Sequence, residues 1–318
     1  MEDRPQPPVP SSILDPPSSI LCVKTVVIHL LRYDDFSAVS DGAVEEKLIG
    51  LLLKHRVPCT FGVIPFVCAP ESLLAAGDVK LTPLPGAKAG LLKPLLQAGL
   101  AEIALHGFAH LALAPVRGLQ EFSDRMPLET QRQLIRRGKG LLESVFGTKV
   151  RLFVPPWNRL GRSTLVVLRE EGLFLSGGEL EAAQGGPEIG QLPCVTSIRE
   201  TDRALATARR FGGQGWVGTV LHDYDFKESD LGAGDVTLAE LDAAVSRWKG
   251  LADVEPRLIS DAISATADGQ GGRALANLIL RETISARRLR RKFMSEVRTV
   301  YWDAATAGRL TRRIRFIP

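Results

Sequence analysis

The chain of 318 residues is 45% hydrophobic and 24% charged, which is ordinary for a globular protein and excludes a disordered one. No stretch reaches the ~20 uninterrupted apolar residues that a membrane span needs. The net charge of +4 is unevenly spread along the chain. The segment from Arg273 to Pro318 has twelve basic and three acidic residues, so the rest of the chain carries a net charge of −5.

The start of the chain is expected to lack a fold. Residues 1–21 are rich in proline and serine and show no basic-then-apolar export pattern. The four cysteines are scattered without a Cys-x-x-Cys pair, which indicates neither a disulfide framework nor a zinc knuckle. We therefore expect a disordered leader and a cytoplasmic protein.

Strand-like apolar runs then alternate with segments of helical periodicity. The predicted strands are Lys24–Tyr33, Pro58–Ile64, Glu102–His106, Val150–Val154, Leu173–Leu175, Gln191–Val195 and Trp216–His222. The predicted helices are Ala43–His55, Ala89–Ala98, Leu128–Phe146, Arg162–Glu171, Asp202–Phe211 and Leu238–Trp248. This alternation favours an α/β fold with a parallel sheet. About seven strands suit a distorted or incomplete (β/α)7 TIM-like barrel over residues 22–265.

Three of the predicted strands end in His or Asp. Asp34-Asp35 follows the first, His106-Gly107-Phe108-Ala109-His110 follows the third, and His222-Asp223 ends the last. Each pair alone has an ordinary explanation as a turn, a cap or a helix surface. Parallel α/β folds, however, carry their chemistry at the carboxyl ends of the strands. The threefold coincidence therefore favours a functional site.

The two histidines His106 and His110 are suited to bind a metal. On one helical turn positions i and i+4 face the same way, so both rings would reach one point, and Gly107 lets the chain turn as it leaves the strand. Two imidazoles with one carboxylate form an open hydrolytic metal site. Such a carboxylate is available at Asp34-Asp35.

These motifs together resemble those of the polysaccharide deacetylase superfamily, also called NodB-homology or family-four carbohydrate esterases. The matching segments, in the family's order, are Asp34-Asp35, His106-x-x-x-His110, Phe153-Val154-Pro155-Pro156-Trp157-Asn158 and Val220-Leu221-His222. They span residues 34 to 222, and their form is that of a divergent branch. The resemblance implies a NodB-type barrel.

The resemblance also implies a role for each matching residue. Asp35, His106 and His110 would bind the metal. Asp34 would be the general base toward the attacking water, and His222 the general acid that protonates the leaving amine. The substrate and the oxyanion would be bordered by Pro156, Trp157 and Asn158, with a backbone N–H near Trp157 as a donor.

The chain departs from the family pattern in two places. The family has an arginine two residues before the second proline, where Val154 stands here. That arginine pairs with the base aspartate, and the candidates to replace it are Arg32, Arg151 and Arg159. The acidic-tryptophan motif that orients the acid histidine has no clear match, and Asp223 or Asp225 could take over its role.

The expected activity is a metal-dependent hydrolase that removes N-acetyl groups from a sugar or glycan. Zn²⁺ is the expected cofactor, and Co²⁺ or Fe²⁺ would suit the same donors. Two alternatives use the same site: an O-acetyl esterase, and a catalytically inactive barrel that binds saccharide. The two departures from the family pattern favour the inactive barrel.

Residues 266–318 are predicted to form a basic, largely helical extension. Apolar residues recur at roughly helical spacing over 273–300, among arginines that include the run Arg287–Lys292. This amphipathic helix is expected either to pack on the barrel or to bind peripherally to the inner face of an anionic membrane. A membrane contact would give access to lipid-linked saccharides. Nucleic acid is not expected as a partner, because no recognised motif accompanies the charge.

Three further residues are given structural interpretations. His29 lies inside a predicted strand and is expected to be a satisfied core histidine. Tyr33 and Phe36 beside the aspartates either pack in the barrel or line the sugar site.

Overall fold

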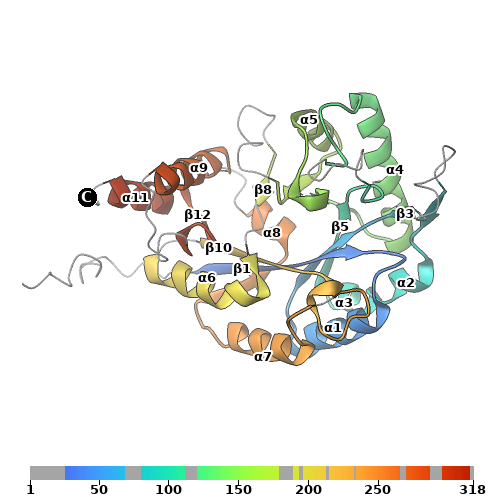
Figure 1. Ribbon diagram of the computed structural model, residues 1–318, viewed down its shortest axis with the longest axis horizontal. Coiled ribbons are helices and arrows are strands. Elements are labelled where there is room, and N and C mark those ends of the chain that lie inside the picture. Colours follow the sequence, from blue (N-terminus) through green and yellow to red (C-terminus); the bar gives the residue numbers. More distant parts are fainter. Residues whose placement is uncertain are drawn as a thin grey trace, which may run out of the picture.

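The computed structural model describes residues 26–68, 80–111, 120–178, 189–192, 196–212, 215–232, 234–265, 270–286 and 296–315, with the side chains of 270–275 and 286 excepted. Its centre is a parallel sheet that curves into an incomplete barrel, with helices on its outer face (Figure 1). The α/β barrel expected from the sequence is confirmed.

Seven parallel strands form the barrel in the spatial order β10-β1-β2-β5-β6-β7-β8. In chain order these strands are β1 (Val27–Phe36), β2 (Cys59–Val63), β5 (Ala101–His106), β6 (Leu152–Val154), β7 (Phe174–Ser176), β8 (Gln191–Leu192) and β10 (Gly215–Leu221). Each corresponds to a predicted strand. The first strand ends later than expected, because β1 continues to Phe36 and includes both aspartates.

Five short strands were not predicted. They are the hairpin β3 (Phe66–Cys68) and β4 (Leu81–Pro83), then β9 (Thr196–Ser197), β11 (Val254–Arg257) and β12 (Tyr301–Trp302). Strand β11 pairs with the start of β1, while β9 and β12 pair with β10. Runs of two to four residues are too short to show a hydrophobic period.

The helices that follow the strands cover the outer face of the sheet (Figure 1). They are α1 (Gly42–His55), α2 (Gly86–Gly90), α3 (Lys93–Gln97), α4 (Leu128–Phe146), α5 (Arg162–Glu170), α6 (Ile198–Phe211) and α7 (Leu238–Lys249). The predicted helix 89–98 is two short helices, because Pro94 stands in the first turn of α3 and cannot donate to a continuous helix.

The interior of the barrel is filled by apolar side chains. Ile28 and Leu30 of β1 belong to this inner cluster, whereas Val27 and Leu31 belong to the outer one, as the alternation of a strand requires. A short helix, α8 (Ile259–Ser264), lies between β1 and β8 and packs in the inner cluster (Figure 1). The barrel is thus a packed core with its chemistry at one rim.

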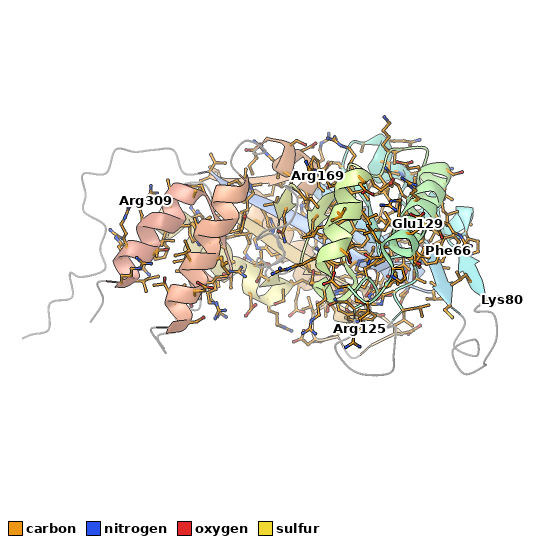
Figure 2. The ribbon with its side chains drawn as sticks, turned by 90° about the horizontal axis from the view of Figure 1, so that it is seen from above. Phe66, Lys80, Arg125, Glu129, Arg169 and Arg309 are labelled. Atoms are coloured by element: carbon orange, nitrogen blue, oxygen red, sulfur yellow. The ribbon has the colours of Figure 1, made fainter. Side chains whose placement is uncertain are left out.

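The C-terminal part of the chain packs against one edge of the sheet. It contains α9 (Gln270–Ala286), β12 and α11 (Ala304–Arg315). Strand β12 runs antiparallel to β10 and pairs with its first two residues. Figure 2 shows Arg309, on α11, at the opposite end of the molecule from Phe66 and Lys80. No helix in the described ranges has the length and apolar character to cross a membrane.

The described part of the predicted helix over 273–300 is helical as far as Ala286, where α9 ends. Strand β12 follows the predicted range, at residues 301–302. The basic run Arg287–Lys292 lies outside the described residues.

Candidate metal centre

The end of β1 brings two adjacent carboxylates to one side of the sheet. The register between β1 and β2 shifts between Tyr33 and Phe36, and Asp35 has a φ of 65°. In a regular strand Asp34 and Asp35 would point to opposite faces. The irregularity redirects them, so that Asp34 is buried and Asp35 is partly exposed at the rim.

The segment from His106 to His110 is a tight bend rather than a helical turn. His106 is the last residue of β5, Gly107 has a φ of 64° and His110 a φ of 53°. The helical geometry assumed for the i, i+4 pair is therefore wrong. The two rings still meet, because the left-handed residues fold the chain back on itself.

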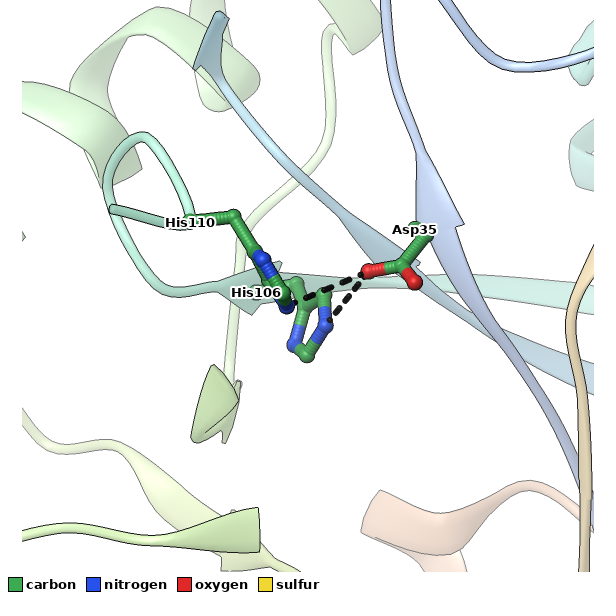
Figure 3. Close-up of side chains that lie close together, drawn as sticks. All are labelled: Asp35, His106 and His110. Carbon is green, nitrogen blue, oxygen red and sulfur yellow. Dashed lines mark hydrogen bonds and ion pairs between the residues drawn. The ribbon is translucent and has the colours of Figure 1, made fainter. Parts of the chain in front are cut away.

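Asp35, His106 and His110 converge on one point (Figure 3). Asp35 Oδ1 lies 3.0 Å from His106 Nε2 and 3.4 Å from His110 Nε2. The three ligand atoms all lie within 4.8 Å of one another. Within the described ranges this is the one group of three such side chains that could hold a metal ion.

His106 is oriented by the neighbouring strand. Its Nδ1 lies 3.0 Å from the carbonyl oxygen of Val154 on β6. A carbonyl only accepts, so Nδ1 carries a proton, and Nε2 is the ring atom that faces Asp35 and donates to its Oδ1. Since His106 is only 3% exposed, the ring is fixed in this orientation by its surroundings.

The charges at the centre hold Asp35 and His110 in the forms that bind a cation. Burial lowers the pKa of His106, but its hydrogen bond to Asp35 and the nearby carboxylates outweigh burial and raise this pKa, so a metal would displace a proton from this ring. Burial raises the pKa of Asp35, but the hydrogen bond from His106 and the nearby histidines outweigh it and lower this pKa to about 2. Burial, together with the charge of His106, lowers the pKa of His110 to about 4. At neutral pH Asp35 is therefore ionised and His110 neutral, which are the ligand forms.

The donor set fits a divalent metal of the Zn²⁺ type. Two imidazole nitrogens and one carboxylate oxygen are the ligands that such ions take in open catalytic sites. Beside them, the Oδ1 atom of Asp34 is buried without a hydrogen-bond partner in the described part of the chain. Buried carboxylate oxygens usually accept a hydrogen bond, so a donor such as a bound water is expected beside Asp34 Oδ1.

Arg32 pairs with Asp34. Its Nη2 lies 2.7 Å from Asp34 Oδ2, and both side chains are buried. The same guanidinium donates to Asn158 Oδ1 at 3.1 Å and to the carbonyl and hydroxyl of Ser176 at 3.0 Å. Arg32, two residues before Asp34 on the same strand, therefore stands where the missing family arginine was expected to act.

The turn after β6 presents Trp157 to solvent beside His110. Trp157 and Asn158 have φ values of 54° and 56°, and the indole is 46% exposed. The indole centroid lies 4.4 Å from that of the His110 ring. The N–H groups of Asn158 and Arg159 are used within the turn, because they donate to the carbonyls of Pro155 and Pro156.

His222 follows β10 and is held by its own loop. Its Nδ1 lies 3.1 Å from Asp225 Oδ2, which also accepts from the His222 backbone N–H at 2.8 Å. The ring stacks on Tyr224, with centroids 4.5 Å apart and an angle of 15°. Of the two candidates, Asp225 contacts His222, while Asp223 accepts from the backbone N–H of Asp41.

Other residues near the site take structural positions. Tyr33 and Phe36 are fully buried in the outer core cluster, which favours the packing explanation. His29 is buried at the other end of β1, with its Nε2 2.9 Å from the Thr219 hydroxyl. Glu121, which binds the His106–His110 bend, had no signal in the sequence.

Comparison with protein-family models gives one match. Residues 25–174 match the model of the polysaccharide deacetylase family. No curated protein matches the chain.

Several solved structures are similar to the chain. A Mycobacterium smegmatis protein classed as a polysaccharide deacetylase is 19% identical, with a TM-score of 0.52 over 76% of this chain and 90% of that one. A family 4 acetyl xylan esterase from Clostridium thermocellum, in complex with a cobalt ion, is 15% identical, with a TM-score of 0.45 over 75% and 91%. A family 4 pseudoenzyme from Bacillus anthracis is 13% identical, with a TM-score of 0.43 over 76% and 66%.

The incomplete parallel barrel is the fold shared with the Mycobacterium smegmatis structure. Residues 25–174, slightly under half of the chain, are similar to the polysaccharide deacetylase family.

Proposed function

We propose that the protein is a metal-dependent hydrolase that removes acetyl groups, N-linked in the first instance, from a saccharide. The observation that carries the proposal is the convergence of Asp35, His106 and His110 within 4.8 Å at the rim of a deacetylase-family barrel. A divalent cation bound there would polarise the acetyl carbonyl and lower the pKa of water. Zn²⁺ is the expected ion, and Co²⁺ or Fe²⁺ would suit the same ligands.

Asp34 has the surroundings of a general base. Its Oδ2 is held by Arg32, and its Oδ1 has no hydrogen-bond partner in the described residues. That oxygen would accept the proton of the attacking water. Because the Arg32–Asp34 ion pair is buried, the carboxylate is already in position before the reaction begins.

His222 would act on the leaving group. Its Nδ1 is directed at Asp225, so its Nε2 is available to donate a proton to the departing amine. Two half-exposed aromatic residues could stack on a sugar ring. Trp157 lies against the His110 ring, and Tyr224 lies against the His222 ring. The backbone N–H of Trp157 would be the oxyanion donor of the turn that contains Pro156 and Asn158.

The test combines metal content with acetate release. Purified protein, loaded with Zn²⁺ or Co²⁺, is assayed on N-acetylated and on O-acetylated oligosaccharides. His106→Ala should lose the metal and all turnover. Asp34→Asn should keep the metal and lose turnover by at least about a hundredfold, which is the range of general-base catalysis.

Each outcome of this test decides something. Stoichiometric metal with no acetate release from either substrate would identify an inactive saccharide-binding barrel. Release from the O-acetylated substrate alone would identify an esterase. Wild-type protein that binds no divalent metal would refute the proposal.

We also propose that helix α11, near the C-terminal end of the chain, contacts an anionic lipid surface. Helix α11 carries four exposed arginines and no acidic residue: Arg309, Arg312, Arg313 and Arg315. Each basic residue near such a surface contributes about 1 kcal/mol. Co-sedimentation with phosphatidylserine vesicles at low salt should be lost with neutral vesicles, at high salt, and in the double variant Arg312→Glu with Arg313→Glu. Equal recovery in the supernatant with both vesicle types would refute the contact.

A further inference from the structure

The bend that carries both metal-binding histidines is built around a buried carboxylate. Glu121 is 4% exposed. Its Oε2 accepts the backbone N–H of Phe108 at 2.9 Å, and its Oε1 accepts the N–H of Ala109 at 2.8 Å. A third, longer contact reaches the N–H of Leu111 at 3.5 Å. Within the described ranges no Lys or Arg forms an ion pair with this carboxylate.

The carboxylate lies directly against Gly107 of the bend. A Cβ atom at Gly107 would lie 2.1 Å from Glu121 Oε2 and 2.5 Å from Pro156 Cγ. Glycine is therefore required at this position both for its φ of 64° and for the closeness of the carboxylate. Glu121 and Pro156 close the bend from two sides.

Burying the Glu121 carboxylate lowers the stability of the protein, which raises the question of what this residue stabilises in return. A buried carboxylate without a cation loses its hydration, and the backbone N–H groups replace only part of it. His110 has a φ of 53°, in the left-handed region, which is strained for a residue with a side chain. A strained residue persists only where its surroundings fix it, and the two charge-assisted hydrogen bonds to the preceding residues supply that constraint.

We propose that Glu121 is a positioning residue for the metal centre: it holds the 106–110 bend so that His110 faces Asp35 before a metal binds. The inference rests on the proposed metal site. Glu121 touches no ligand atom and acts only through the backbone of Phe108 and Ala109. Its effect is therefore on the affinity for the metal rather than on the identity of the ligands.

The test uses Glu121→Gln, with Glu45→Gln as a matched control. Glu45 is also a buried glutamate, but it contacts Tyr33, Ser40 and Lys88 away from the bend. Zn²⁺ affinity is measured by calorimetry on metal-free protein, together with the melting temperature. Glu121→Gln should weaken Zn²⁺ binding about ten- to a hundredfold, the range for partners of metal ligands. Glu45→Gln should lower the melting temperature and change the affinity less than threefold.

A second measurement needs no variant. In metal-free wild-type protein the amides of Phe108 and Ala109 should exchange with solvent at least about a hundredfold more slowly than in an unfolded chain, because both are buried and bonded. Unprotected amides would overturn the proposal, as would a Glu121→Gln variant with wild-type Zn²⁺ affinity. Should wild-type protein bind no Zn²⁺, the proposed function fails, while the exchange data still decide whether Glu121 orders the bend.

Discussion

The two sides of the centre are held together in different ways. On the metal side, the contacts join residues far apart in the chain: Arg32 reaches Asn158 and Ser176, and His106 reaches Asp35. On the side of His222, the contacts are local, to Tyr224 and Asp225 within one loop. The metal side therefore depends on the assembled barrel, whereas the acid side is encoded in four consecutive residues.

This difference predicts how each side responds to substitution. A change on the metal side should affect stability and activity together, because the same contacts serve both. A change on the acid side should affect activity alone. The following experiments test the distinction, in order of expected effect.

The largest effect is expected for Arg32→Met. The substitution leaves Asp34 buried without its cation, which costs about 3–5 kcal/mol of unfolding free energy. Acetate release should be lost as well, since the base is no longer held. Urea unfolding and the acetate assay measure the two effects. Arg151→Met, at an exposed arginine over the Phe174 ring, serves as the control and should change stability by less than about 1 kcal/mol. A stable Arg32→Met protein would contradict the coupling.

Asp225→Asn should separate activity from stability. The amide can no longer favour the proton on His222 Nδ1 as a carboxylate does, so the turnover rate should fall about a hundredfold. Metal content and the urea midpoint should stay unchanged. The neighbouring Asp223→Asn is the control, with its main effect on stability through Asp41. A lowered urea midpoint in Asp225→Asn would show that the acid side is not local after all.

The smallest effect is expected at the far end of β1, where His29 is buried away from the centre. Burial lowers the pKa of His29 to about 4, so between pH 6.5 and pH 4 the unfolded chain binds a proton that the folded chain does not. Stability should therefore fall as the pH is lowered, by about 2 kcal/mol from this group between pH 7 and pH 5. In His29→Gln that part of the slope should vanish in urea titrations, with acetate release unchanged at pH 7. An equally steep slope in the variant would refute this assignment.

The sequence predicts what depends on periodicity and on position along the chain. The seven barrel strands follow from their apolar runs, and the polar residues at the ends of β1, β5 and β10 follow from the rule for parallel sheets. The shape of the 106–110 bend does not follow, because it is held by Glu121, which lies further along the chain.

The arginine that pairs with Asp34 illustrates the same limit. Three arginines were candidates, and only the assembled barrel brings Arg32 against Asp34, Asn158 and Ser176. Its position two residues before the aspartate on one strand face was a usable signal, since side chains i and i+2 point the same way. The hydrogen bonds from Arg32 to Ser176 on β7 could not be predicted, because no local sequence pattern links these two residues.

Strand β12 has a consequence for the solution behaviour of the protein. It pairs with Gly215 and Trp216, on the side of β10 that would otherwise be an open edge. Exposed edges of this kind recruit strands from other molecules. A chain truncated before α9 would uncover this edge and Trp216, and we expect it to aggregate at concentrations where the whole chain stays monodisperse in light scattering.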